Sequence, residues 1–395
     1  MINNNIILFY MSELLSQGGY GCVYYPSLTC TGKAESSKKS VSKIQRKDWA
    51  SKNEIEIGKL VKKIANSNSF FLPITSSCNI NISSIDNKLV KDCRVIQKRP
   101  DSDYVLMKMN YLENISFTNY LKSSGESNAH LILKVVESFR NLASSLEKLA
   151  DIDVVHHDLK LDNILVSAHD NLPVIIDFGI SLNMKNISET DNRLKDYFYV
   201  HAPDYYPWSL DIHIINYIVQ VRSDGEYGAI NFEELREIAD DYCKGNLALD
   251  VFSDDFKKAY KKKCYSYINS LVGKRNNEIL RILLNNYKYW DIYALSVIYI
   301  RLIGFIFNNK YPKTKFLSEF VELNLINLSP NPNERFSCKD SIKYIDDIIS
   351  KEDSLRDLSK TIKSINIDDQ TLTDSIESGM KNLKKVAEKG VYKFT

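Results

Sequence analysis

The stretch VVHHDLKLDNILV, residues 154–166, places a carboxylate, a lysine and an amide between two apolar runs. The carboxylate of Asp158 can orient a hydroxyl nucleophile and accept its proton. Lys160, two residues later, can neutralise charge on a transferring phosphoryl group. The side-chain oxygen of Asn163 is a hard ligand suited to Mg²⁺. This order of residues predicts a catalytic loop rather than a polar surface turn.

A second acidic motif follows in VIIDFG, where Asp177 stands at the end of a strongly apolar run. A carboxylate at the end of a buried apolar strand is costly unless it binds a cation. Phe178 offers a core anchor, and Gly179 offers a flexible joint. Asp177 is therefore a candidate metal ligand together with Asn163.

Upstream, LLSQGGYGCVYYP (14–26) carries Gly18, Gly19 and Gly21 between two strand-like runs. Glycines let backbone N–H groups approach phosphate oxygens, but a plain hairpin turn explains them equally well. A Walker-type loop is excluded, because no GxxxxGK[ST] pattern follows.

Lys43 lies in the middle of the apolar strand SVSKIQ (40–45). An inward-facing lysine there needs a carboxylate partner. The helix predicted at 49–65 offers Glu54 and Glu56, and the sequence does not choose between them.

These segments fit an α+β architecture, with a small antiparallel β-sheet lobe containing one helix and a larger α-helical lobe. Branched and aromatic residues predict strands in the first lobe at 22–25, 40–45, 70–74, 93–98 and 103–109. Helical periods predict a long helix at 129–150 and a mostly helical region at 209–349. The boundaries are an N-terminal extension at 1–11, a domain at 12–349 with lobes at about 12–110 and 111–349, and a charged tail at 350–395.

Bulk properties narrow the class. The formal charge of +2 suggests neither nucleic acid nor an anionic membrane as the main partner. Seven cysteines without a CxxC pair predict free thiols in a reducing compartment. The N-terminus lacks the basic region of a signal peptide. The apolar stretch 290–307 contains Asp291 and Arg301, so we expect a buried core helix and no transmembrane segment.

Together these motifs resemble eukaryotic-type protein kinases, in family order over roughly residues 12–349. SQGGYGCV resembles the Gly-rich loop, VSKI the strand-lysine motif, HHDLKLDN the catalytic loop and HAPDYYPW the A-P-E region. WDIYALS and NPNER resemble two later helical-lobe motifs. The residues at the matching positions, beyond those given above, are Ser16, Val23, His156, Asp204, Asp291 and Arg335.

The resemblance implies a two-lobed kinase that uses ATP with Mg²⁺ or Mn²⁺ and phosphorylates serine or threonine in proteins. It implies that Met107 lines the adenine pocket before a hinge at 108–112, and that Asp204 pairs with Arg335. The local sequences GGYGCVYYP, VSKIQ and WDIYALS are most similar to those of kinases encoded by large cytoplasmic DNA viruses of the poxvirus and mimivirus type. A cytoplasmic location, in the host cytoplasm or the virion, would follow.

Departures from the family pattern leave alternatives. The long gap before Asp291 predicts a helical insertion at 212–289, either packing decoration or a site for a substrate or partner. His157 stands where most members have an arginine that binds a phosphorylated loop residue. We therefore expect activity without loop phosphorylation, although the loop offers Ser188 and Thr190. The competing hypotheses are a small-molecule kinase of the same fold and a catalytically dead scaffold.

Overall fold

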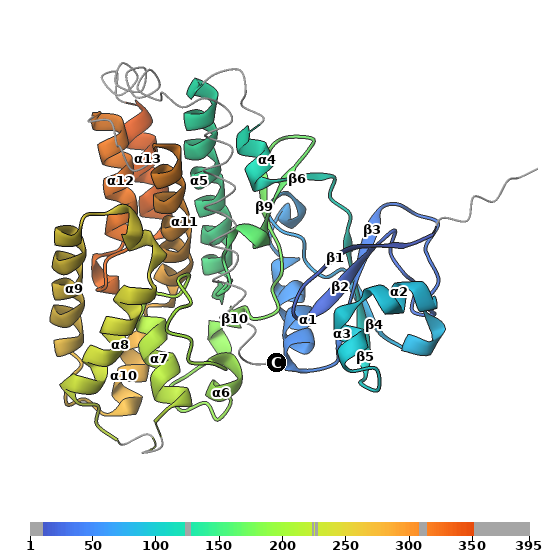
Figure 1. Cartoon of the computed structure of the whole chain (residues 1–395), viewed down its shortest axis with the longest axis horizontal. Coiled ribbons are helices and arrows are strands. Elements are labelled where there is room, and N and C mark those ends of the chain that lie inside the picture. Colours follow the sequence, from blue (N-terminus) through green and yellow to red (C-terminus); the bar gives the residue numbers. More distant parts are fainter. Residues whose placement is uncertain (1–10, 123–127, 223–224, 226–227, 308–313, 351–395) are drawn as a thin grey trace, which may run out of the picture. The chain divides into compact units, whose positions relative to one another are not determined.

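The computed structural model describes residues 11–122, 128–222, 225, 228–307 and 314–350. The chain divides into two compact units (Figure 1). Unit 1 comprises residues 1–113 and 176–180, and unit 2 comprises residues 114–175 and 181–395. The predicted N-terminal extension lies outside the described residues except for Met11, and the predicted tail lies outside them except for Ser350.

Unit 1 is built on a five-stranded antiparallel sheet with the strand order β1-β2-β3-β5-β4. The strands are β1 (Glu13–Gln17), β2 (Gly21–Tyr25), β3 (Ser40–Arg46), β4 (Ser76–Ile80) and β5 (Tyr104–Asn110). The predicted strands at 22–25, 40–45 and 103–109 are confirmed. In this register Lys43 lies opposite Val23 on one side and Met107 on the other.

Three helices accompany the sheet, where the sequence predicted one. They are α1 (Trp49–Val61), α2 (Asn87–Asp92) and α3 (Arg94–Lys98). The strand predicted at 93–98 is wrong, because short apolar runs look alike in helices and strands. The strand predicted at 70–74 is also wrong: this segment contains Pro73, which has no N–H to donate to a ladder, and β4 begins after it.

Helix α1 begins at a capping box. The side chain of Asp48 accepts a hydrogen bond from the Ser51 N–H, and the Ser51 hydroxyl oxygen accepts one from the Asp48 N–H. One face of the helix is buried and carries Ile57, Val61 and the carboxylate of Glu54. The cap and the apolar spacing together fix the helix that presents Glu54.

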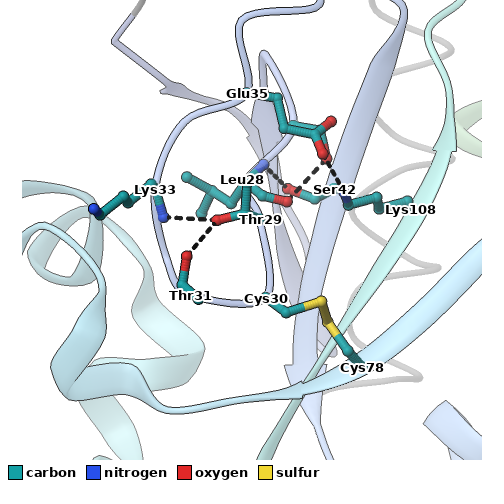
Figure 2. Close-up of a disulfide and its surroundings, with 10 residues drawn as sticks. Leu28, Thr29, Cys30, Thr31, Lys33, Glu35, Ser42, Cys78 and Lys108 are labelled. Atoms are coloured by element: carbon teal, nitrogen blue, oxygen red, sulfur yellow. Dashed lines mark hydrogen bonds and ion pairs between the residues drawn. A yellow bond between two sulfur atoms is a disulfide. The ribbon is translucent and has the colours of Figure 1, made fainter.

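The expectation of free thiols is wrong for four of the seven cysteines, because unit 1 contains the disulfides Cys22–Cys93 and Cys30–Cys78. The first joins β2 to the start of α3. The second joins the loop between β2 and β3 to β4 (Figure 2). No CxxC pattern announces either bond, because their partners are 71 and 48 residues apart.

Hydrogen bonds hold the same loop onto the sheet (Figure 2). The Leu28 N–H donates to the Ser42 hydroxyl at 2.9 Å, and Glu35 forms an ion pair with Lys108 of β5. Disulfide and polar contacts therefore anchor the loop to three neighbouring strands.

Unit 2 is mostly helical. Its helices are α4 (Phe117–Lys122), α5 (Asn128–Asp151), α6 (Leu194–Tyr197), α7 (Leu210–Gln220), α8 (Phe232–Gly245), α9 (Asp254–Asn269), α10 (Asn276–Leu284), α11 (Trp290–Ile306), α12 (Lys315–Asn327) and α13 (Cys338–Ser350). Helices α5, α11, α12 and α13 lie side by side (Figure 1). Their core includes Phe139, whose ring meets the rings of Tyr299 and Phe320 edge-on.

Two small sheets complete unit 2 and carry its chemistry-bearing loop. One has the order β6-β8-β9 and the other pairs β10 with β7. Their strands are β6 (Asn114–Ser116), β7 (Val154–Val155), β8 (Ile164–Ser167), β9 (Pro173–Ile175) and β10 (Leu182–Asn183). Residues 156–163 connect β7 to β8, so the two apolar runs of the opening motif become strands on either side of a loop.

The segment Tyr287–Ile306, which includes α11, is long and apolar enough to cross a membrane, but 89% of its apolar window is buried inside the protein. Two charged residues of this segment, Asp291 and Arg301, have polar partners inside the protein. Asp291 accepts two backbone N–H groups, and Arg301 pairs with Asp250 at 3.3 Å. These contacts agree with the predicted core helix.

The predicted insertion at 212–289 is helical. It holds most of α7 and all of α8, α9 and α10, with a short 3₁₀ turn at Leu247–Val251. A buried tyrosine cluster joins it to α11, since the Tyr242 hydroxyl lies 2.8 Å from those of Tyr260 and Tyr293. The insertion is therefore part of the core of unit 2 rather than a loose appendage.

Candidate active site

Unit 1 contains an ion-pair triad around Lys43. Its Nζ lies 2.8 Å from Glu54 Oε2 and 3.1 Å from Asp177 Oδ1. Glu56, the other candidate partner, lies on the exposed face of α1 and pairs with Lys59. The structure therefore resolves the choice that the sequence left open, in favour of Glu54.

Burial shapes the ionisation of this triad. Burial alone would lower the pKa of Lys43, but the carboxylates of Asp177 and Glu54 raise it by a larger amount. The pKa of Lys43 therefore lies above its usual value, and the ammonium stays charged. For Glu54 burial dominates and raises its pKa to about 6, although Lys43 opposes the shift. The Asp177 side chain is 39% exposed and is the least buried of the three. A cation could therefore reach Asp177 more easily than it could reach Glu54.

The residues after Asp177 are held in unit 1 by α1 and a nearby ring. The Gly179 N–H donates to Asp177 Oδ1, and the Gly179 carbonyl accepts from Asn53 of α1. Phe178 is buried and meets Phe71 edge-on at 6.0 Å. Asp177 itself has φ 65°, an unusual conformation for a non-glycine residue, and the neighbouring contacts keep it there.

The glycine-rich turn connects β1 to β2. The Gly18 N–H donates to the Gly21 carbonyl at 3.0 Å and closes the turn. Gly21 is required by packing, because a Cβ there would lie 2.6 Å from the Ile44 carbonyl oxygen. Gly18 has open space around it, and Ser16 is exposed on β1. The packing need at Gly21 is independent of any phosphate.

Met107 is fully buried on β5, directly opposite Lys43. It belongs to an apolar cluster with Ile74 and Val105, against which Ile55 of α1 packs. Met107 therefore lies next to the triad lysine in the sheet.

Unit 2 contains a separate cluster of polar residues, in the loop between β7 and β8. Lys160 Nζ lies 3.0 Å from Asp158 Oδ1 and 2.9 Å from Oδ2. Asn163, in a short 3₁₀ turn at Leu161–Asn163, donates from Nδ2 to the Asp158 carbonyl at 2.8 Å and to Asp158 Oδ2 at 3.0 Å. The three polar residues of the motif thus form one connected cluster.

The donor chemistry suits a hard cation that is also held by phosphate oxygens. Because Nδ2 of Asn163 faces Asp158, its carbonyl oxygen is the atom left for a metal. The described residues contain no group of three or more His, Cys, Asp or Glu side chains that could hold a metal alone. Mg²⁺ usually takes one or two protein oxygens together with substrate phosphates and water, so the side-chain oxygen of Asn163 in unit 2 and the carboxylate of Asp177 in unit 1 are each of a type that suits it.

His157 is a packing residue. It is 3% exposed, and its ring stacks on Trp208 at 5.1 Å and meets Phe198 edge-on. Within the described residues neither ring nitrogen has a hydrogen-bond partner. Burial lowers its pKa to about 3, although Asp158 opposes the shift. A histidine in the place of the usual arginine could be a weak, titratable cation, but this buried ring is neutral.

The predicted Asp204–Arg335 pair is also wrong. Arg335 forms a bidentate pair with Asp211, with Nη2 2.8 Å from Oδ1, and both side chains are fully buried. Trp290 also donates to Asp211, at 2.7 Å. Asp204 is only half-buried, and its backbone packs on Gly245, where a Cβ would lie 2.9 Å from the Asp204 Cα.

Asp291 holds the start of the loop from α11. Its carboxylate accepts the N–H groups of His156 at 2.7 Å and His157 at 3.0 Å. The His156 carbonyl accepts from Ser181 at 2.9 Å. Residues far apart in the sequence therefore set the backbone from which Asp158 projects.

With this geometry in place, comparison with known families is decisive for residues 9–205, which match the model described as the protein kinase domain. The chain contains a protein kinase domain. The Lys43 triad of unit 1 and the Asp158 cluster of unit 2 both fall in the matched range, whereas Asp211, Asp291 and Arg335 lie beyond it. The β-sheet of unit 1 and the helices of unit 2 fit a kinase fold.

The sequence did not reveal two residues of unit 2 that contact the loop between β7 and β8. Tyr205 donates a hydrogen bond to Asp158 Oδ1, and Trp208 donates to the His157 carbonyl at 2.9 Å. Asp211 was missed as well, although a charged residue in the apolar run LDIHII was a usable signal for a buried ion pair. No comparable pattern pointed to Tyr205 or Trp208, because aromatic residues are common throughout this chain.

Proposed function

We propose that this protein kinase transfers the γ-phosphoryl group of ATP to serine or threonine hydroxyls of proteins. The observation that carries the proposal is the cluster of Asp158, Lys160 and Asn163 on one short loop. It combines a proton acceptor, a cation for the phosphoryl group and a metal ligand. A lysine two residues after the aspartate is usual in protein serine/threonine kinases and unusual in tyrosine and small-molecule kinases.

The residues of unit 1 bind the nucleotide in this proposal. Backbone N–H groups at Gly18, Gly19 and Gly21 cover the phosphates, and Lys43, oriented by Glu54, contacts the α- and β-phosphates. Mg²⁺ or Mn²⁺, held by Asn163 and Asp177, would neutralise phosphate charge.

In the transfer itself, Asp158 orients the substrate hydroxyl and takes its proton. A bond forms between the hydroxyl oxygen and the γ-phosphorus, while the bond from that phosphorus to the β,γ-bridging oxygen breaks and ADP leaves. Lys160 neutralises the charge that gathers on the transferred group.

We also propose that activity does not require loop phosphorylation. The neutral, buried His157 provides no cation for a phosphate at the position where most relatives have arginine. Ser188 and Thr190 are exposed and can be modified, so the idea can be tested directly. Phosphatase-treated protein, and the double variant Ser188→Ala with Thr190→Ala, should keep at least half of the activity; inactive stripped protein would refute the proposal.

The activity is tested by radiolabelled phosphate transfer to a generic basic protein with Mg²⁺ or Mn²⁺. Asp158→Ala and Asp177→Ala should each remove nearly all labelling, while Glu56→Gln, an exposed control on α1, should leave it unchanged. Phosphoamino-acid analysis should show label on serine or threonine. Equal labelling by the wild type and the double variant Asp158→Ala/Asp177→Ala would show that this protein does not catalyse the transfer, and would refute the proposed activity.

The same assay separates the rivals. Labelling of aminoglycosides or choline without labelling of protein would identify a small-molecule kinase. Nucleotide binding without any transfer would identify a scaffold.

Origin, location and partners remain proposals based on sequence resemblance: a viral source, a place in the host cytoplasm or virion, and a partner site on the insertion. Disulfides are typical of proteins from oxidising compartments. Cys22–Cys93 and Cys30–Cys78 therefore weigh against the free thiols expected of a cytoplasmic protein. Thiol alkylation of the protein taken directly from its source cells would decide whether the bonds exist there.

A further inference from the structure

Tyr205 has a contact that the proposed mechanism does not use. Its phenol donates a hydrogen bond to Asp158 Oδ1. The side chain is 3% exposed, and its ring meets Trp208 edge-on at 4.7 Å. A residue this buried keeps one position, so the phenol is a fixed donor and not a mobile surface group.

The carboxylate of Asp158 is fully engaged in this state. Oδ1 accepts from Lys160 and Tyr205, and Oδ2 accepts from Lys160 and Asn163. A carboxylate offers about four lone-pair sites in total. A substrate hydroxyl can therefore bind Asp158 only after one of these donors has moved away.

The donors differ in what else the reaction asks of them. Lys160 is needed at the transferred phosphoryl group, and Asn163 is needed at the metal. Lys160 would leave Asp158 when the nucleotide binds, which frees a site on Oδ2. Asn163 can offer its side-chain oxygen to the metal while Nδ2 stays on Asp158. Tyr205 has no second task, so its hydrogen bond to Oδ1 can persist as well.

The backbone around Tyr205 is anchored to the same loop. The Trp208 indole donates to the His157 carbonyl at 2.9 Å, and the His157 ring stacks on that indole. The Tyr205 N–H donates to the Ala202 carbonyl, and the Trp208 N–H to the Tyr205 carbonyl. Residues 202–208 are thus a compact turn clamped onto the residues that precede Asp158.

We propose that Tyr205 is a positioning residue for the transfer step: its phenol fixes the Asp158 carboxylate through Oδ1 and leaves Oδ2 for the substrate hydroxyl. This inference rests on the proposed function. The hydroxyl proton goes to Asp158 Oδ2, and Tyr205 keeps its own proton throughout. Burial, together with Asp158, raises the pKa of the phenol well above its usual value, which agrees with a permanent donor.

The test compares Tyr205→Phe with Tyr206→Phe. Tyr206 is equally buried and stacks near Tyr205, but its hydroxyl has no hydrogen-bond partner among the described residues. Loss of a hydrogen bond to a charged group should lower the kcat of Tyr205→Phe by about tenfold or more. The KM for ATP and the melting temperature should stay near those of the wild type, and Tyr206→Phe should match the wild type in all three.

Three results would overturn the proposal. One is a Tyr205→Phe kcat within twofold of the Tyr206→Phe value. Another is a higher kcat, which would mean that the phenol competes with the substrate. The third is a loss of kcat accompanied by an equal rise in the KM for ATP or a large fall in melting temperature, as expected of a merely structural residue.

The design also separates this proposal from the proposed function. If the wild-type protein transfers no phosphate, both the proposed function and the proposed role of Tyr205 are refuted. If the wild type is active and Tyr205→Phe is equally active, only the role of Tyr205 is refuted. If Tyr205→Phe does not fold, p-aminophenylalanine and p-methylphenylalanine at position 205 give the same comparison. The first keeps a donor and should retain turnover, and the second fills the space without one and should lose it.

Discussion

Units 1 and 2 both contain buried charges, but they are held together differently. Unit 1 is a small sheet with three short helices and two disulfides, and its buried lysine is shared between two carboxylates. Unit 2 has a large helical core, and one of its buried arginines, Arg335, pairs with one carboxylate in a closed, bidentate arrangement. A smaller unit buries a smaller fraction of its surface on folding than a larger one does, so extra covalent bonds add relatively more to its stability.

The two sets of buried charges also differ in whether they can take part in a reaction. The Lys43 triad includes Asp177, whose side chain is 39% exposed and can exchange its partner for a cation. The Asp211–Arg335 pair is sealed and can do nothing but hold structure. An ion pair with one exposed member can work in a reaction, and a completely buried pair is a structural element.

The largest expected effect is on the sealed pair. Asp211→Ala leaves a buried guanidinium without its partner and should destabilise unit 2 by about 3–5 kcal/mol. Asp204→Ala, at the position first expected to pair with Arg335, should change the free energy of unfolding by less than about 1 kcal/mol. Denaturant unfolding measures both, and a greater loss for Asp204→Ala would reverse the assignment.

The next effect concerns the disulfides of unit 1. Replacing Cys22 and Cys93 by serine removes a bond across a long loop and should cost about 2–4 kcal/mol. Cys243→Ser is the matched control in unit 2, because its sulfur lies 3.7 Å from that of Cys264 and is not bonded to it. Hydrogen exchange read segment by segment should show faster exchange in unit 1 for the double variant only. Unchanged exchange in unit 1 would contradict a stabilising role.

The two units should respond oppositely to acid. Burial lowers the pKa of His157 and of His213 to about 3, so the unfolded chain takes up protons below about pH 6.5 that the folded unit 2 refuses. Unit 2 should therefore lose about 1.4 kcal/mol per histidine between pH 7.5 and 5.5. In unit 1 the pKa of Glu54 is raised to about 6, so this group favours the folded state as pH falls from 6 towards 4.5.

Urea unfolding followed by hydrogen exchange at several pH values checks these slopes. His213→Phe should reduce the pH dependence of unit 2 by about half, whatever its effect on stability at neutral pH. A pH dependence of unit 2 that stays unchanged in this variant would show that the ring is not buried neutral.

The smallest expected effect compares two glutamates on α1. Glu54→Gln removes one charge partner of Lys43 and should lower kcat/KM for ATP by about tenfold, since an oriented lysine is needed at the phosphates. Glu56→Gln should leave kcat/KM unchanged, because Glu56 pairs only with exposed Lys59. Equal losses in the two variants would show that the choice of Glu54 is wrong.

Local patterns in the sequence predicted many of the strands, helices and loops that carry the candidate site residues. The alternation of apolar residues gave three of the five strands of unit 1 and α1, and the spacing of Asp158, Lys160 and Asn163 gave the loop between β7 and β8. These features depend on neighbouring residues, so a short window of sequence contains their cause. The errors at 70–74 and 93–98 occur where an apolar run is too short to distinguish a strand from a helix.

Only the tertiary structure decided which distant residues meet. Glu54 rather than Glu56 faces Lys43, and Asp211 rather than Asp204 faces Arg335. Cys22 is bonded to Cys93, just before α3, and Cys30 to Cys78 in β4. The sequence determined that His157 precedes the catalytic aspartate, and tertiary packing decided that its ring is neutral and supports Trp208. The physical reason is the same in each case: pairing and burial depend on the fold of the whole unit, whereas strand, helix and loop preferences are set by adjacent residues.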